Sequence, residues 1–220
     1  MIKAVIFDMD GLLIDSEPLW HEAEVEAAKL ALIDLTHEQC LETTGLKSNK
    51  IVEHWFSHIK PWTSPSQKEI EEALVKKLIA RVNERGEAMP GAREILEMIK
   101  EKNVKMALAS SSLMSIIDAT VEKLDIRKYF DELYSAEFEE HGKPHPGVYL
   151  TTAKMLDVAP EHCLAFEDSF NGLLAAKSAR MKCVSVPDEH LRGDKRLAIA
   201  DVILNSLEDF NEETWERLNG

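Results

Sequence analysis

The sequence predicts an α/β protein with a Rossmann-like doubly wound parallel sheet and an inserted all-helical domain. Two observations support this fold class. Short apolar runs alternate with helical patterns along most of the chain, as strands and helices of a parallel sheet do. Residues 19–86 interrupt the alternation, because they carry helical patterns and no convincing strand.

The strands are predicted from short runs rich in apolar and β-branched residues, which are typical of strands buried on both faces of a sheet. These runs are residues 2–7, 104–109, 163–166 and 183–186, with a further strand at 133–135. Helices are predicted where apolar residues recur at helical spacing. They are residues 91–102, 113–124, 146–156 and 169–180. Strands and helices alternate, so the sheet is expected to be parallel.

The interrupting region has two clear helical segments. The apolar side chains of residues 48–59 fall on one helix face, and a Ser-x-x-Glu capping box at Ser66 begins a second, longer helix. We therefore predict two domains. An α/β core is formed by residues 1–14 and 88–220, and a helical cap domain by residues 15–87.

The composition indicates a globular protein with a net negative charge. Apolar residues make up 45% of the 220, and 26 Lys and Arg stand against 40 Asp and Glu, for a net charge of −14. This charge argues against a nucleic acid or an anionic membrane as partner. The first strand begins at Ile2, which leaves no room for a signal peptide, and no apolar run is long enough to span a membrane. We expect a cytoplasmic monomer.

Polar and charged residues follow the predicted strands where each strand ends. Because parallel strands end at the same edge of the sheet, these residues are expected to gather there. They are Asp8 and Asp10, Ser110, Ser111 and Ser112, Lys143, and Glu167, Asp168 and Ser169. Each alone has an ordinary structural explanation, since serine caps helices and acidic residues favour helix N-termini. Their joint arrival at one edge favours a functional site.

Asp8 and Asp10 create a charge problem at this edge. Two carboxylates this close repel each other, and burial disfavours both charges unless a cation compensates them. Mg²⁺ prefers oxygen ligands and commonly takes one or two carboxylates together with a substrate phosphate. Lys143 and the Ser110 hydroxyl would then bind the remaining phosphate oxygens. The sequence therefore predicts a phosphate site that uses Mg²⁺.

In this order and context, these residues resemble the four motifs of the haloacid dehalogenase superfamily. The motifs are Asp8-Met9-Asp10-Gly11, a strand ending in Ser110, Lys143 in the segment GKPHP, and Glu167-Asp168-Ser169. The resemblance spans essentially the whole chain, and the helical insert resembles the cap of the β-phosphoglucomutase-like subfamily. More narrowly, the segment FDMDGLLIDSEPLW is similar to bacterial phosphatases of hexitol phosphates or 2-deoxyglucose 6-phosphate.

The resemblance implies a Mg²⁺-dependent phosphatase that hydrolyses small sugar or sugar-alcohol phosphates through an aspartyl-phosphate intermediate. Asp8 is then the nucleophile and Asp10 the general acid and base. The implied Mg²⁺ ligands are Asp8, Asp10 through its backbone carbonyl, Asp168 and Glu167. The implied phosphoryl ligands are Ser110, Ser111 and Lys143.

Substrate specificity is expected to come from the cap. We expect Lys47, in a loop at residues 43–48, to reach the sugar hydroxyls or the phosphate, and Trp20 to line the sugar pocket. The alternative is that Trp20 packs in the cap core and Lys47 is an exposed cation. In the family's β-phosphoglucomutases a histidine takes the position of Trp20, so mutase activity is the weaker alternative. A receiver-like signalling domain, which stores phosphate, is an alternative from another class. Its phosphoacceptor follows a middle strand, and it lacks a helical insert.

Overall fold

The computed structural model describes residues 1–43 and 45–220 and contains a parallel sheet of six strands. The strands are β1 (Ala4–Phe7), β2 (Lys105–Ser110), β3 (Glu132–Ser135), β4 (Cys163–Glu167), β5 (Lys182–Ser185) and β6 (Val202–Ile203). Their order across the sheet is β3-β2-β1-β4-β5-β6, and every neighbouring pair is parallel. The five strands predicted from apolar runs are present, whereas β6 is too short for a pattern to reveal it.

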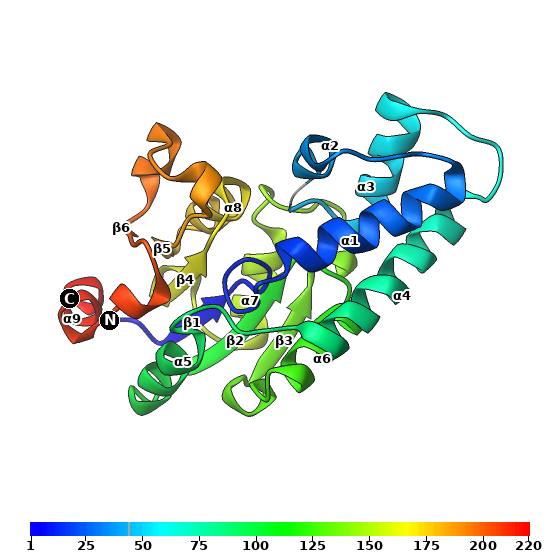
Figure 1. Ribbon diagram of the computed structural model, residues 1–220. Coiled ribbons are helices and arrows are strands. Elements are labelled where there is room, and N and C mark those ends of the chain that lie inside the picture. Colours follow the sequence, from blue (N-terminus) through cyan, green and yellow to red (C-terminus); the bar gives the residue numbers. More distant parts are fainter. Residues whose placement is uncertain (44) are drawn as a thin grey trace.

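Helices cover both faces of the sheet (Figure 1). Side chains of β1 alternate between the faces, so that Val5 and Phe7 pack in one core while Ala4 and Ile6 pack in the other. The first core includes α5 (Ala92–Glu101), α6 (Met114–Lys123) and α9 (Glu212–Asn219), and the second includes α7 (Gly147–Met155) and α8 (Phe170–Ser178). This arrangement confirms the doubly wound fold, and burial on both faces explains why the strands read as apolar runs.

Between β1 and α5 the described residues form helices and no strand. These helices are α1 (Glu17–Ala28), α2 (His37–Leu41), α3 (Ser48–His54) and α4 (Gln67–Arg85). We call them the helical insert; they lie together on one side of the sheet, with α1 alongside α4 (Figure 1). The predicted domain boundaries fall in the two segments that join the insert to the sheet, and the division into two domains remains a prediction.

Two local predictions in the insert had different outcomes. The capping box at Ser66 is confirmed, because the Glu69 N–H donates to Ser66 Oγ at 3.3 Å and the Ser66 N–H donates to Glu69 Oε2 at 2.8 Å. The segment 48–59 is not one regular helix. α3 ends at His54, and the chain continues as a wider π-helical turn that begins with the fully buried Trp55.

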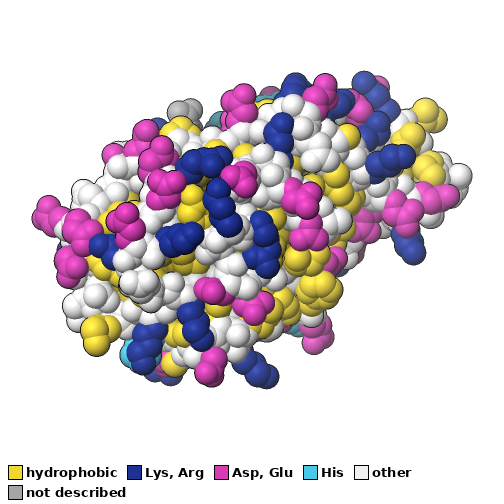
Figure 2. All heavy atoms as spheres, turned by 90° about the horizontal axis from the view of Figure 1, so that it is seen from below, with side chains coloured by type: hydrophobic (Ala, Val, Ile, Leu, Met, Phe, Trp, Pro, Cys, Tyr) yellow, Lys and Arg dark blue, Asp and Glu magenta, His cyan; other side chains and the backbone are white. Residues whose placement is uncertain are grey.

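The two ends of the chain lie side by side (Figure 1). The Ile2 N–H donates to Asn219 Oδ1 of α9 at 2.8 Å, and Trp215 and Leu218 of α9 join the core. Figure 2 shows a face on which Lys and Arg side chains lie among Asp, Glu and apolar side chains. Among the described residues, no helix is long and apolar enough to cross a bilayer.

Candidate active site

A change in winding direction creates a crevice beside β1. The chain adds β2 and β3 on one side of β1, and β4, β5 and β6 on the other. Open α/β sheets bind ligands at the carboxyl ends of the strands at such a point. Asp8 directly follows β1, and its backbone N–H donates to the Phe166 carbonyl of β4 at 3.0 Å. The sheet therefore fixes Asp8 at the crevice.

Lys143 reaches the same point from the loop before α7. Its ammonium donates to Asp8 Oδ1 at 2.7 Å, to Glu167 Oε1 at 2.6 Å and to the Ala109 carbonyl at 3.2 Å. The side chain is only 4% exposed. Burial lowers the pKa of Lys143, but the Asp8 and Glu167 carboxylates more than offset this, so the pKa is raised and the ammonium stays charged.

Negative charge exceeds positive charge around Lys143. Asp8, Glu167 and Asp168 bring carboxylate oxygens within 4.8 Å of one another. Burial raises the pKa of Asp8 to about 7, although the Lys143 ammonium lowers it. Burial, followed by the charge of Asp8, also raises the pKa of Asp168. These carboxylates could hold a divalent cation, which would relieve their mutual repulsion.

Two glycines make room for these carboxylates. Gly11 has a φ of +70°, and a Cβ there would lie 2.4 Å from Asp168 Oδ2. A Cβ on Gly172, in the first turn of α8, would lie 1.9 Å from Glu167 Oε1. Gly11 belongs to the motif quoted from the sequence, whereas nothing in the sequence connects Gly172 to Glu167.

Asp10 lies between the end of β2 and the helical insert. Its Oδ2 accepts hydrogen bonds from Ser112 Oγ at 2.7 Å and from Ser110 Oγ at 3.3 Å. Its Oδ1 accepts a hydrogen bond from Trp20 Nε1, in the first turns of α1, at 3.0 Å. The insert therefore contributes directly to the orientation of the Asp10 carboxyl group.

Most of the predicted residues line one cavity of about 380 Å³ between the insert and the sheet. Those residues are Asp8, Asp10, Trp20, Ser110, Ser111, Lys143 and Asp168. Lys47 points elsewhere: its ammonium donates to the Glu139 carbonyl at 2.9 Å and so joins the insert to the loop before Lys143. Thr44, in the same predicted loop, lies outside the described residues. Sugar binding by Lys47 remains a prediction.

Two residues that complete the hydrogen bonding had no assigned role in the predicted site. Ser112 was predicted to lie at this edge but was given no role; its hydroxyl donates to Asp10, and its position two residues after Ser110 is the signal that could have assigned this role. The hydroxyl of the fully buried Tyr149 donates to Glu167 Oε1 from α7. Tyr149 carries no sequence signal, because its helical position is equally typical of an ordinary core residue.

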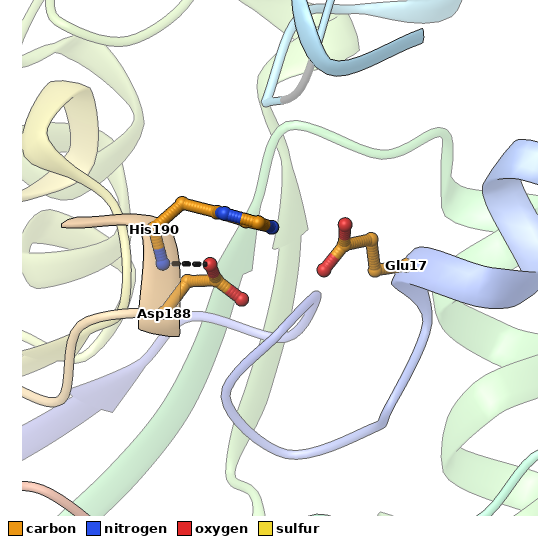
Figure 3. Close-up of side chains that lie close together, drawn as sticks. All are labelled: Glu17, Asp188 and His190. Carbon is orange, nitrogen blue, oxygen red and sulfur yellow. Dashed lines mark hydrogen bonds between the residues drawn. The ribbon is translucent and has the colours of Figure 1, made fainter. Parts of the chain in front are cut away.

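A second group of side chains of metal-binding type lines the same cavity. Figure 3 shows these side chains. Glu17 begins α1, and Asp188 and His190 follow β5; their ligand atoms lie within 4.8 Å of one another. The His190 N–H donates to Asp188 Oδ1 at 2.8 Å. Burial, and then the charge of Asp188, raise the pKa of Glu17. The three side chains meet across the gap between the insert and the sheet.

The fold and this site define a family. Residues 2–180 match the family model described as haloacid dehalogenase-like hydrolase. The chain therefore belongs to the haloacid dehalogenase-like hydrolases.

Individual relatives narrow the class of enzyme within this hydrolase family. Hexitol phosphatase B of Escherichia coli (strain K12) is 41% identical over 210 residues, which cover 95% of this chain and 94% of that protein. A crystal structure of β-phosphoglucomutase from Clostridium difficile has a TM-score of 0.87 at 25% identity, covering 100% and 97% of the two chains. A mutant of CbbY from Rhodobacter sphaeroides, in complex with xylulose-(1,5)bisphosphate, has a TM-score of 0.86 at 27% identity, covering 95% and 96%. With the family match, the phosphatase relative identifies this chain as a phosphatase.

Proposed function

We propose that this phosphatase uses Mg²⁺ to hydrolyse phosphate esters of small sugars or sugar alcohols, such as hexitol phosphates or 2-deoxyglucose 6-phosphate. The observation that carries the proposal is the buried contact of Lys143 with Asp8, two residues from Asp10, in a cavity of about 380 Å³. A cavity of this size suits a small ligand. The relative named hexitol phosphatase B supports the substrate class.

In the proposed mechanism, Asp8 and Asp10 act in turn. An Asp8 carboxylate oxygen attacks phosphorus, and the bond between phosphorus and the ester oxygen breaks, which gives an aspartyl-phosphate. Asp10 donates a proton to the departing oxygen, so a neutral alcohol leaves. The ionised Asp10 then takes a proton from a water molecule that attacks the phosphorus. Phosphate leaves, and the Asp8 carboxylate is restored.

Lys143 and Ser110 support the transfer. The Lys143 ammonium, 2.7 Å from Asp8 Oδ1, neutralises charge on the nucleophile and on the incoming phosphoryl group. The Ser110 and Ser111 side chains line the same cavity and can donate to phosphoryl oxygens. Trp20 and Ser112 orient the Asp10 carboxyl for both of its proton transfers.

The donor set fits Mg²⁺, because it consists of oxygen atoms and carries excess negative charge. Asp8 and Asp168 would hold the ion, together with the Asp10 carbonyl. Glu167 already accepts hydrogen bonds from Lys143 and Tyr149, so we propose that it mainly orients Lys143. When bound, Mg²⁺ supplies positive charge that stabilises the phosphoryl oxygens.

Phosphate release from a panel of hexose, deoxyhexose, hexitol and pentose phosphates tests the proposal. We expect turnover with Mg²⁺, loss of turnover with EDTA, and no turnover by Asp8→Asn. Activity that survives in Asp8→Asn would refute the covalent mechanism. Stoichiometric labelling without turnover would favour a receiver-like phosphoacceptor instead.

A phosphosugar mutase is the second candidate, because the fold closely matches that of the C. difficile β-phosphoglucomutase. Such an enzyme would interconvert positional isomers of a sugar phosphate with little release of inorganic phosphate. Incubation of a sugar 1-phosphate, followed by separate measurement of the 6-phosphate and of free phosphate, distinguishes the two activities.

A further inference from the structure

Glu24 is a buried acid of the insert that the proposed reaction does not use. It lies on α1, four residues after Trp20, is 4% exposed and lines the cavity that contains Asp8 and Asp10. Residues four apart occupy the same helix face, so Trp20 and Glu24 form one wall of this cavity. The opposite face of α1 has a different role, because Glu22 and Glu26 form ion pairs with α4.

The partners of Glu24 are neutral. The Thr43 hydroxyl lies 3.3 Å from Glu24 Oε2 and shares its single proton with the Cys40 carbonyl at 2.9 Å, and the Cys40 thiol is the other hydrogen-bonding group beside Glu24. In the part of the chain that the structure describes, no ion pair joins Glu24 to a Lys or Arg. Burial raises the pKa of Glu24 to about 7, while Cys40 and Thr43 lower it. A buried acid without a cation destabilises the fold when it ionises, and such groups are concentrated at functional sites.

The position of Glu24 relative to Asp10 indicates which part of a substrate it would meet. Trp20 donates to Asp10, the residue that faces the ester oxygen in the proposed reaction. Four residues of α-helix advance about 6 Å, so Glu24 lies about one helical turn beyond the reacting end of the cavity. The carbon chain of a six-carbon substrate extends over such a distance.

We propose that Glu24 is a specificity-determining residue that accepts hydrogen bonds from hydroxyl groups on the carbon chain of the substrate. The inference rests on the proposed phosphatase function and identifies how the insert recognises a polyol. A carboxylate has two oxygens and about four acceptor positions, enough for two neighbouring hydroxyls in addition to Thr43. The same negative charge repels a second phosphate at that end of the substrate, so Glu24 favours monophosphates over bisphosphates.

Replacement of the acid by leucine tests this assignment. For Glu24→Leu we expect kcat/KM for a hexitol 6-phosphate to fall at least about tenfold more than kcat/KM for p-nitrophenyl phosphate, mainly through KM. The leaving group of p-nitrophenyl phosphate has no hydroxyls for Glu24 to bind. Glu24→Gln, which keeps one acceptor oxygen and is the variant of closest shape, should restore part of the selectivity.

Glu26→Gln is the matched control, because it removes one negative charge from the outer face of the same helix, where Glu26 pairs with Lys77 and Arg81. Its selectivity should equal that of the wild type. Equal losses on both substrates in Glu24→Leu and in Glu24→Gln would show a purely structural role and overturn the inference. A wild-type enzyme that turns over p-nitrophenyl phosphate but no sugar or hexitol phosphate would overturn the proposed function itself, and the inference with it.

Discussion

The indole N–H of Trp20 donates to Asp10 Oδ1 at 3.0 Å, from the helical insert to the end of β1. Trp20→Phe removes this donor and keeps an aromatic ring, although a smaller one, in the cavity wall. In the proposed mechanism Asp10 becomes ionised as it gives its proton to the leaving oxygen, and a hydrogen bond to a charged group contributes about 1.5–3 kcal/mol; we take the lower end because both residues are partly exposed and Ser112 still bonds Asp10. A loss of about 1.5 kcal/mol lowers kcat roughly tenfold.

Steady-state release of phosphate from a hexitol phosphate measures this effect. We expect kcat to fall and KM to change little, because Lys143 and Ser110, which we propose as the phosphoryl ligands, are untouched. Trp62→Phe is the control: its indole donates to the Pro65 carbonyl at 2.7 Å within the insert, far along the chain from Asp10. If Trp20→Phe folds normally and its kcat equals that of Trp62→Phe, orientation of Asp10 by Trp20 is refuted.

Three further changes test the packing and charge of the site. Gly172→Ala should lower the free energy of unfolding by about 1–3 kcal/mol, because the added Cβ would lie 1.9 Å from Glu167 Oε1. Thermal unfolding measures this loss. The control is Gly220→Ala, whose added Cβ would lie 3.6 Å from the nearest atom. Tyr149→Phe removes a hydrogen bond to buried Glu167 and should cost about 1–3 kcal/mol in urea unfolding, and an unchanged midpoint would contradict this. The raised pKa of Glu24, about 7 against 4.5, means that the folded state keeps its proton to higher pH than the unfolded state. The Glu24 contribution to stability is therefore full below pH 4.5 and is lost as pH rises to about 7, a change of roughly 3 kcal/mol. Glu24→Gln should abolish this pH dependence of the free energy of unfolding. If the free energies of unfolding of Glu24→Gln and wild type differ by a constant amount between pH 4.5 and pH 8, the raised pKa of Glu24 is disproved.

The sequence alone predicted the sheet well, because the patterns that indicate strands and helices lie within short segments of the chain. Apolar runs identify strands buried on both faces, and the helical patterns between them require parallel pairing. The rule that parallel strands end at one edge then brought Asp8, Ser110 and Asp168 to one place, and the structure has them lining one cavity. The short strand β6 was missed, since two residues carry no periodicity. The helix α9 was also missed, although Asn211 caps its first turn and its buried residues Trp215 and Leu218 are three positions apart.

Contacts between distant parts of the chain could not be predicted from such signals. The sequence patterns predicted Lys47 and Trp20 as substrate ligands, but such local patterns do not indicate how the insert packs against the sheet. Only the tertiary structure brings Lys47 to the Glu139 carbonyl and the Trp20 indole to Asp10.

The sequence by itself therefore determined the class of fold, the polar edge of the sheet and the family motifs, because periodicity and residue order are sufficient for these. Tertiary structure decided which groups are buried and which partners they find. Burial of Glu24 beside Thr43, and of Glu167 between Lys143 and Tyr149, depends on contacts between different elements, 18 to 24 residues apart in the sequence. An ionised side chain in water has little free-energy cost, whereas the same side chain buried in a cavity is costly unless it is paired with another group or binds a ligand.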